Sequence, residues 1–402
     1  MGTIAEKLTY LEGTKSAIKD AIIAKGVEVT DTDTFRSYAE KIESIESGGS
    51  CESQSKEINI TDNGTRVITP DEGYLLDQVT VNTNITTGKP VLPNGISFEG
   101  STWTTFDTDP YDWSQVYSGT SMFVSCTRLK TLTGTGIENV YFLDLFSTFA
   151  NCNSLTEIPK LYGRPTTINS LFDSCRNLNE VDLSGLDLSD LSDISEAFLS
   201  CKEWVQNIDF RNSPIRMASR AFSSSSITQL PLINYALLEN VDYMFSYTNL
   251  ISVNLDFQRV LSAHQLFYYC TLLEEVHFNG MKFNEDLSYM FYACENLTTI
   301  TGLQCGNVKS TSVGSTFSGC SKLTNIDGLF NLGESFTGTT TISLANSPLL
   351  TRESCLNIFN TIYDFIGNGS TYRPTLDLHQ DVLAQLSEED IAIATAKGWI
   401  VK

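Results

Sequence analysis

Cysteine is the residue of this chain whose chemistry is easiest to suspect, because a thiolate can act as a nucleophile, ligate a metal or pair with a second sulfur. The 402 residues include ten cysteines, and seven of them stand three residues after a phenylalanine. In "SYMFYACENLTTI", from Ser288 to Ile300, Phe291 is followed in this way by Cys294. The other six are Cys126, Cys152, Cys175, Cys201, Cys270 and Cys320.

The spacing of these cysteines does not suit a metal centre. Zinc sites gather four ligands from pairs spaced like CxxC, whereas neighbouring cysteines of this set are more than twenty residues apart. Such spacing predicts one cysteine on each turn of a coil, buried as a small apolar side chain with a free thiol. Disulfides between successive turns stay open as an alternative, since Cα atoms about 5 Å apart can be bridged. A reducing cytosol would prevent them at first.

The phenylalanines before the cysteines belong to a repeat. Nine of them recur at intervals of 22 to 26 residues, and two units carry Ser225 and Thr248 in place of the cysteine. A large apolar residue, usually leucine, follows near +6 and another apolar residue near +9, as Leu297 and Ile300 follow Phe291. The nine are Phe123, Phe149, Phe172, Phe198, Phe222, Phe245, Phe267, Phe291 and Phe317.

A repeat of this length predicts a solenoid, because one unit cannot bury its apolar side alone whereas stacked units share a continuous core. We expect each unit to contribute one short strand near +9 and a helix or turn around the phenylalanine. Both ends of such a body need caps. The predicted caps are residues 91–120, with Trp103 and Trp113 as cover residues, and residues 337–402.

The unit pattern "MF.AC.NL..I..L" resembles the BspA-type leucine-rich repeats of bacterial surface proteins. The segment "DLSGLDLSDLSDISEAFLSC" (182–201) is similar to related repeats of mycoplasma and gut-bacterial lipoproteins. The resemblance covers about residues 120–335 and implies a leucine-rich-repeat fold, commonly used for adhesion. The expected fold class is therefore an α/β solenoid: a leucine-rich-repeat body of about nine units with capping elements, preceded by a small helical pair and a small β module.

Composition and pattern divide the chain into six segments. They are an N-terminal helical anchoring module (1–46), a flexible linker (47–55), a small β module (56–90), the front cap (91–120), the repeats (121–336) and the rear cap (337–402). The first predicted helix ends at Gly26 and has an apolar face of Leu8, Leu11, Ile18, Ala21 and Ile22. The second has an apolar face of Phe35, Tyr38, Ile42 and Ile45.

The β module and the rear cap carry recognisable turn and cap signals. Residues 56–86 predict strands around the turn formers "DNG" and "PDEG". In the rear cap we expect a strand at "TLDLH" and a last helix running from a box-like Ser387…Asp390 cap to Gly398. A preceding amphipathic helix is predicted to carry the stripe Leu356, Phe359, Ile362, Phe365 and Ile366.

The front of the chain has a second resemblance. The segment "ITDNGTRVITPDEGY" resembles a small β element of bacteriophage tail and fibre proteins, and "TKSAIKDAIIAKGVEVTDTDTFRSYAEKI" resembles N-terminal modules of the same proteins. Together they cover roughly the first 90 residues. This resemblance implies a virion protein that attaches to other virion proteins through residues 1–90.

The charge balance excludes some classes of partner. With 26 basic residues and a net charge of −22, the chain does not suit nucleic acid or an anionic membrane, both of which need clustered positive charge. The sequence contains no run of about 18 apolar residues, so no transmembrane helix is predicted. The start "MGTIAEKLTYLEG" lacks the basic and apolar regions of a signal peptide. We expect synthesis in a host cytoplasm and release within a virion.

Few residues favour catalysis or metal binding. The three histidines belong to no HExxH motif, and GxSxG and P-loop patterns are absent. The segment "DTDPYD" (107–112) has the spaced acidic residues of a calcium loop but lacks its glycine and its closing glutamate. We therefore predict a protein that is not an enzyme, with no catalytic residue, metal site or cofactor.

Two surfaces of the solenoid could bind a partner. Polar and mostly acidic residues flank the +9 position and should face solvent by alternation; the candidates are Glu180, Asp182, Asn254, Glu275, His277 and Thr299. Six tyrosines near the phenylalanines of three consecutive units should form one patch suited to sugars or proteins; they are Tyr243, Tyr247, Tyr268, Tyr269, Tyr289 and Tyr292. A solvated sheet and tyrosines partly buried between turns are the plainer alternatives.

These observations lead to one functional hypothesis with two alternatives. We expect a non-enzymatic phage tail fibre or receptor-binding protein, a homo-oligomer whose repeat body contacts a host-surface protein or glycan. The first alternative is a bacterial cell-surface adhesin. The second is a head fibre or other structural virion component that binds no receptor.

Overall fold

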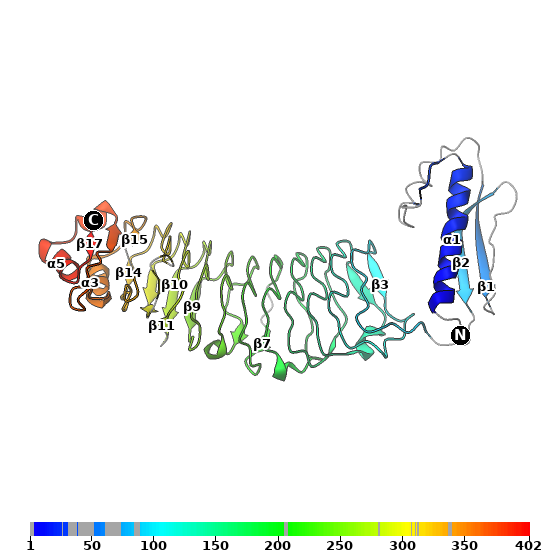
Figure 1. Ribbon diagram of the computed structural model, residues 1–402, viewed down its shortest axis with the longest axis horizontal. Coiled ribbons are helices and arrows are strands. Elements are labelled where there is room, and N and C mark those ends of the chain that lie inside the picture. The colour runs from blue at the N-terminus through cyan, green and yellow to red at the C-terminus, as the bar shows by residue number, and fades with distance from the viewer. Residues whose placement is uncertain are drawn as a thin grey trace. The chain divides into compact units, whose positions relative to one another are not determined.

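The computed structural model describes residues 4–25, 27–30, 38, 52–60 and 74–83 and, from 89 to 402, all but 205–207, 280–281, 307, 310, 312 and 337–339. The chain separates into two compact units, Met1–Lys89 and Pro90–Lys402 (Figure 1). Each unit is described by itself. Within the described residues, no helix has the length and apolar character needed to cross a membrane.

The first unit contains the helix α1 (Ile4–Ala24). Ile22 is buried and Ile18 half-buried, as expected, because they pack in a small cluster with Val29 and Tyr38. The prediction for Ala21 is wrong: it is exposed, because the described part of this cluster meets the helix only at Ile18 and Ile22. The side chains of Leu8 and Leu11, the stop at Gly26, and the second helix apart from Tyr38 lie outside the described residues.

The same unit contains two strands, β1 (Glu52–Ile60) and β2 (Tyr74–Thr83). They pair in parallel, from Glu52 opposite Tyr74 to Ile60 opposite Thr83. Strand β1 takes in residues 52–55, the end of the segment predicted as a linker. The chain between the two strands, which contains the expected "DNG" and "PDEG" turns, is outside the described residues.

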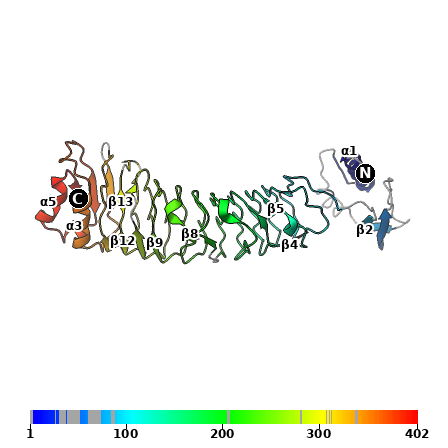
Figure 2. The same ribbon diagram turned by 90° about the horizontal axis from the view of Figure 1, so that it is seen from below.

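The second unit is a stack of coils whose short strands pair in parallel (Figures 1 and 2). The first strands are β3 (Thr105–Asp107), β4 (Thr131–Thr133), β5 (Tyr141–Phe142), β6 (Tyr162–Gly163), β7 (Asp209–Phe210) and β8 (Leu232–Ile233). They continue with β9 (Ser252–Leu255), β10 (Glu275–Phe278), β11 (Lys282–Phe283), β12 (Thr299–Thr301), β13 (Gln304–Cys305) and β14 (Asn325–Ile326). Strands β9, β10, β12 and β14 form a four-stranded sheet, and the solenoid of stacked coils expected from the sequence is observed.

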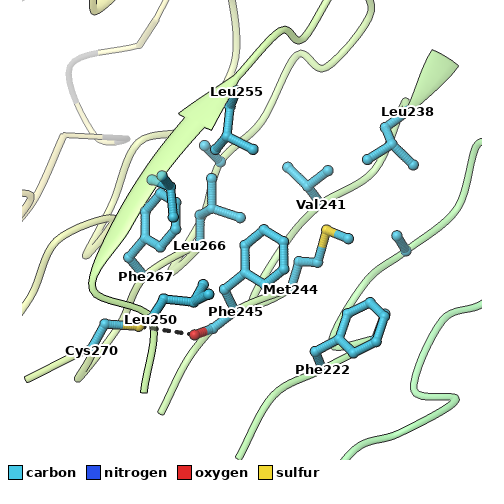
Figure 3. Packing of buried hydrophobic residues seen from close by; sticks show 14 of the residues in the cluster. Phe222, Leu238, Val241, Met244, Phe245, Leu250, Leu255, Leu266, Phe267 and Cys270 are labelled. Carbon is cyan, nitrogen blue, oxygen red and sulfur yellow. Dashed lines mark hydrogen bonds between the residues drawn. The ribbon is translucent and has the colours of Figure 1, made fainter. Parts of the chain in front are cut away.

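The nine repeat phenylalanines form one continuous stack at the centre of the coils. Their rings are almost completely buried, and neighbouring ring centroids are 5.4 to 6.3 Å apart with interplanar angles of 1° to 32°. Figure 3 shows Phe222, Phe245 and Phe267 following one another in this way. Phe98, inside the predicted front cap, stacks on Phe123 at 5.3 Å and continues the row, which the sequence reading missed.

The chain around each of the nine phenylalanines is a turn with left-handed residues on both sides. The residues at −2 and +2 have positive φ, between 52° and 62° in all but Gly319. At −2 they are Ser121, Ser147, Ser170, Glu196, Arg220, Tyr243, Gln265, Tyr289 and Ser315. At +2 they are Ser125, Asn151, Ser174, Ser200, Ser224, Tyr247, Tyr269, Ala293 and Gly319.

This backbone conformation turns three N–H groups of each coil toward the next coil. The N–H groups at −2, 0 and +2 donate to the carbonyls at −3, −1 and +1 of the following unit, at 2.7 to 3.1 Å, across all eight junctions. For example, Phe267 donates to Met290 at 2.9 Å and Tyr269 to Tyr292 at 2.8 Å. The left-handed residues therefore carry the hydrogen bonds that join one coil to the next.

The repeat cysteines are buried in the core, as predicted, and the nine described cysteines are free thiols. Each of the seven donates its Sγ–H to a phenylalanine carbonyl in the preceding coil, at 2.9 to 3.2 Å; Figure 3 shows the bond from Cys270 to Phe245. That carbonyl also accepts a hydrogen bond from its own coil, such as the N–H of Cys152 on Phe149 at 3.1 Å or the hydroxyl of Thr248 on Phe245. In the two units without cysteine, Ser225 and Thr248 donate to the phenylalanine of their own coil.

The expected strand near +9 forms in some units only. Leu132, Val253, Val276, Ile300 and Ile326 are buried on β4, β9, β10, β12 and β14. The prediction is wrong for Ile158 and Val181, which lie on no strand. Pro159 directly follows Ile158 and has no N–H for a ladder. Pro231 has the same effect in the unit of Phe222, where β8 begins only after the proline, at Leu232.

The front segment packs its aromatic residues over the first coil. Trp113 is buried and donates its Nε1–H to the carbonyl of Thr108 at 2.8 Å. Trp103 is exposed on one side and packs against Phe98 and Phe106, with ring centroids 5.7 and 5.1 Å away. These contacts cover the apolar end of the stack.

The rear segment contains β15 (Thr341–Leu344), α3 (Arg352–Thr361), β16 (Thr375–Leu378), α4 (Gln380–Leu383), α5 (Glu388–Ala396) and β17 (Ile400–Val401). The capping box of Ser387 and Asp390 and the strand at "TLDLH" are confirmed. The stripe predicted for α3 is partly wrong. Cys355, Ile358 and Phe359 face the core, whereas the helix ends before Ile362.

Serine 200 tests the left-handed turn. Its φ is 57°, so Ser200→Gly should raise the free energy of unfolding, by up to about 1 kcal/mol, because glycine adopts this conformation without steric cost. Ser200→Val should lower it by about 1 kcal/mol or more, because a β-branched residue is strained there. Denaturant unfolding of both variants gives the two values, and the same sign for both would contradict a left-handed Ser200.

The buried thiols predict an alkaline loss of stability. Burial raises the pKa of Cys270 to about 11 and of Cys320 to about 12, whereas an unfolded thiol ionises near pH 8.5. Above about pH 9 the unfolded state therefore loses thiol protons that the folded state keeps, and stability falls by at most about 1.4 kcal/mol per pH unit for each such thiol.

Cys270→Thr isolates this effect, since the preceding coil already carries Thr248 at the same place. Guanidinium unfolding with a reductant at pH 8, 9.5 and 10.5 should show the wild type losing stability relative to the variant as the pH rises. A stability difference that stays constant over this range would show that Cys270 ionises equally in both states.

Candidate functional site

The acidic candidates Glu180 and Asp182 line an open groove of about 960 Å³. It lies at the units of Ile158 and Val181, in which the strand near +9 does not form. Its apolar lining includes Ile158, Val181 and Leu186. Asp182 is 3.5 Å from Lys160, and hydrogen bonds from Ser184, chiefly its hydroxyl, hold the pKa of Asp182 below its usual range. Arg164 pairs with Asp187 and Asp190 at 3.5 and 2.8 Å. The carboxylates of the rim are largely occupied by cations of the chain itself.

The other strand-face candidates lie apart from this groove, on the sheet of β9, β10 and β12. Asn254 and Glu275 are exposed, and His277 and Thr299 are half-buried, in agreement with the predicted alternation. Nδ1 of His277 is 2.7 Å from the hydroxyl of Thr301, and its Nε2 is 3.5 Å from Glu275. A carboxylate, an imidazole and a hydroxyl thus form a row.

Neither an enclosing cavity nor an oxyanion hole accompanies this row among the described residues. It lies on the solvent face of an open sheet and borders neither described cavity. The backbone N–H groups on either side belong to the parallel ladders of β10 and β12, so none is aimed at a reacting oxygen as an oxyanion hole requires. Among the described residues, no three His, Cys, Asp or Glu side chains are grouped to hold a metal ion.

Five of the six tyrosines predicted as a patch have rings in contact, and Tyr243 adjoins them through His264, whose ring lies 5.1 Å from Tyr243 and 6.4 Å from Tyr289. We call the six the tyrosine platform: Tyr243, Tyr247, Tyr268, Tyr269, Tyr289 and Tyr292. Tyr268 is at its centre, with ring centroids of Tyr269, Tyr292 and Tyr247 at 4.7, 5.1 and 5.5 Å. Tyr289 adjoins Tyr268 and Tyr292 at 6.3 and 5.7 Å. The exposed fractions of Tyr247, Tyr269 and Tyr289 are 51%, 38% and 39%, so the platform faces solvent.

The expectation that Tyr289 and Tyr292 share a helix is wrong. Tyr289 is the left-handed residue at −2 of Phe291, with a φ of 58°, and Tyr292 follows the phenylalanine in the same turn. The two rings still approach because the turn is tight. Four of the six tyrosines, Tyr243, Tyr247, Tyr269 and Tyr289, have left-handed backbones.

Polar side chains that the sequence reading missed complete one edge of the platform. The Tyr243 hydroxyl and Nε2 of His264 are 3.1 Å apart, and Gln265 donates to that hydroxyl at 3.1 Å. The Arg220 guanidinium lies over the Tyr243 ring at 4.8 Å and pairs with Glu196 at 3.1 Å. Arg220 and Gln265 occupy the same −2 position as Tyr243 in neighbouring coils, so the period contained the signal.

A second exposed apolar group was also missed in the first coils. It consists of Tyr117, Tyr141, Leu143, Phe146 and Tyr162. Tyr141 is opposite Tyr162 in the pairing of β5 and β6, and Leu143 donates its N–H to the carbonyl of Tyr117 at 2.8 Å. These residues stand outside the +6 and +9 positions, and for that reason the repeat pattern did not mark them.

Known proteins were compared with the chain at the levels of sequence and structure. No curated protein matches the sequence. A leucine rich cell surface protein of Faecalibacterium prausnitzii A2-165 is similar in structure, with 15% identity over 70% of this chain and 88% of that protein and a TM-score of 0.27. A leucine-rich repeat protein of Bacteroides ovatus ATCC 8483 has 14% identity over 74% and 92% of the two chains and a TM-score of 0.25.

The family described as "BspA type Leucine rich repeat region" matches six copies in the sequence, over residues 119–250, 189–278 and 241–360. The matches contain all of the stacked phenylalanines from Phe123 to Phe317 and extend into α3. They span more than half of the 402 residues. The chain therefore belongs to the BspA-type leucine-rich repeat family.

Proposed function

We propose that this chain is a non-enzymatic adhesion protein displayed at a bacterial cell surface, and that its repeat body binds its ligand on the tyrosine platform. Family membership supports the first part, since repeats of this type resemble those of bacterial surface proteins used for adhesion. The second part rests on one observation. Large exposed tyrosines occupy backbone positions where the other coils mostly carry small residues.

The conformation of these tyrosines gives the observation its weight. A left-handed backbone costs a bulky residue roughly 1–2 kcal/mol, and contacts between rings return about 0.5–1.5 kcal/mol for each pair. At the same +2 position, Ser174, Ser200 and Ser224 adopt the same left-handed conformation and have no aromatic ring. Stability alone therefore gives little reason for tyrosine here, whereas a binding surface needs exposed rings held in fixed positions.

The open form of the surface supports binding without catalysis. Tyr247, Tyr269 and Tyr289 of the platform are exposed to solvent, and neither described cavity includes any of its residues. The three histidines each have a different partner. His264 packs on Tyr243, His277 bonds Thr301, and His379 caps α4.

A phage tail fibre or receptor-binding protein is the second candidate. It is favoured by the resemblance of the first 90 residues to modules of bacteriophage tail and fibre proteins. In that case residues 1–90 would bind other virion proteins, the chain would form a homo-oligomer, and the platform would contact a host-surface protein or glycan. Immunogold labelling of intact bacteria and of purified phage particles with antibody to the full chain distinguishes the two locations.

The double variant Tyr247→Ser/Tyr269→Ser tests the proposed function. Both residues occupy the +2 position, which is serine in other coils such as those of Ser174, Ser200 and Ser224, so the turn should persist while the exposed rings are removed. Fluorescently labelled full chain should adhere to at least one member of a panel of bacterial and epithelial cells, and the double variant should adhere at least tenfold less, because buried aromatic anchors dominate such contacts.

Tyr117→Ser is the matched control, since Tyr117 is as exposed as Tyr247 but lies outside the platform. It should adhere like the wild type, and circular dichroism should show the same fold for all three proteins. Equal adhesion of the double variant and the wild type would exclude the platform, and absence of adhesion to every cell would contradict the adhesion function.

A further inference from the structure

We propose that the ligand of the tyrosine platform is an uncharged polysaccharide that lies across several coils, so that its sugar rings pack against the outer faces and the exposed edges of the tyrosine columns. This inference rests on the proposed adhesion function. Its starting point is the order of the rings, since a ligand made of repeated units fits a surface made of repeated units.

The tyrosines form two short columns that follow the coils. At the +2 position Tyr247 and Tyr269 are stacked 5.2 Å apart with an interplanar angle of 11°. At the +1 position Tyr268 and Tyr292 are stacked 5.1 Å apart at 18°. Because one backbone hydrogen bond joins each +2 residue to the +1 residue of the next coil, these ring positions are fixed relative to one another.

Small residues border the +2 column at both ends. Ser224 precedes Tyr247, and Ala293 and Gly319 follow Tyr269 in the next two coils. The two tyrosine rings therefore extend beyond the smaller side chains of the adjoining coils. Inside each column the parallel rings cover each other's inner faces, so the outer faces and the hydroxyl-bearing edges remain for a ligand. They offer apolar surface to the C–H groups of a sugar ring and hydrogen-bonding groups to its hydroxyls.

Hydrogen-bonding side chains are grouped beside the rings. His264 and Gln265 lie 3.1 Å apart, and both are within 3.1 Å of the Tyr243 hydroxyl. These groups can donate to or accept from sugar hydroxyls. The only cation described at this edge, Arg220, is already paired with Glu196.

The charge of the chain selects against an anionic polymer. The net charge is −22, and long-range repulsion would slow the approach of a polyanion. The small size of the platform argues against a protein partner. A stable protein interface covers about 800 Å² on each side with 20–30 residues, whereas the platform consists of six tyrosines. An uncharged polysaccharide avoids the repulsion and needs only a few stacked rings.

The first experiment uses cells to which the full chain adheres. Periodate cleaves vicinal diols of their glycans, and protease removes their proteins. Platform-dependent adhesion should fall at least tenfold after periodate and survive protease. Adhesion that survives periodate but is lost after protease overturns the polysaccharide while leaving the adhesion function intact.

The second experiment needs no cell and separates the two proposals further. Native gels containing dextran, mannan, arabinoxylan or hydroxyethyl cellulose should retard the wild type and Tyr117→Ser, but not Tyr247→Ser/Tyr269→Ser. Carboxymethyl dextran and carboxymethyl cellulose are the matched anionic polymers and should retard the wild type less than their uncharged partners. Retardation by a neutral polymer without adhesion to any cell supports the ligand class and rejects the adhesion function.

If no neutral polymer retards the wild type and no cell binds it, both proposals fail. Stronger retardation by the carboxymethyl polymers than by their uncharged partners would also overturn the inference, because the charge argument would then be wrong.

Discussion

The hydrogen bonds between successive phenylalanine turns are the constraint on which this molecule depends. Each coil directs three N–H groups to carbonyls of the next, and this requires left-handed residues at −2 and +2 of the phenylalanine. The phenylalanine between them then points inward onto the ring of its neighbour. Its carbonyl lies in the core, where an acceptor needs partners. The cysteine of the following coil supplies one, and this explains a small thiol at that place better than redox or metal chemistry does.

The periodicity of the side chains made the body of the fold predictable, because the type of a residue indicates whether its side chain is buried. The phenylalanine, the leucine at +6 and the apolar residue at +9 are large, apolar and regularly spaced, so their burial followed from the sequence alone. The backbone was less predictable. The residues at −2 include serine, glutamate and tyrosine, and these residue types have no common property that indicates a left-handed conformation. Only the hydrogen bonds to the next coil impose that conformation.

Local exceptions to the repeat were predictable only where a residue carries its own backbone constraint. Pro159 could have marked the missing strand near Ile158, since proline cannot donate to a ladder. The parallel pairing of β1 with β2 could not have been read from the turn formers between them, because parallel strands need a crossover, which turn residues do not specify. For the platform, the period correctly grouped six tyrosines but assigned a helix to the turn that holds them.

The coil spacing also determines what the platform can do. A tyrosine on an isolated loop would lose conformational freedom on binding, whereas each of these rings is attached to a turn that is hydrogen-bonded on both sides and packed on a buried phenylalanine. The strain of the left-handed tyrosines is local, while the stacked core that resists it extends over many coils. A solenoid can therefore hold costly residues at one place without losing its fold. Rings held in this way at 5.1 and 5.2 Å within each column form a preorganised surface, and a ligand gains most from such a surface when its own units repeat along the same direction.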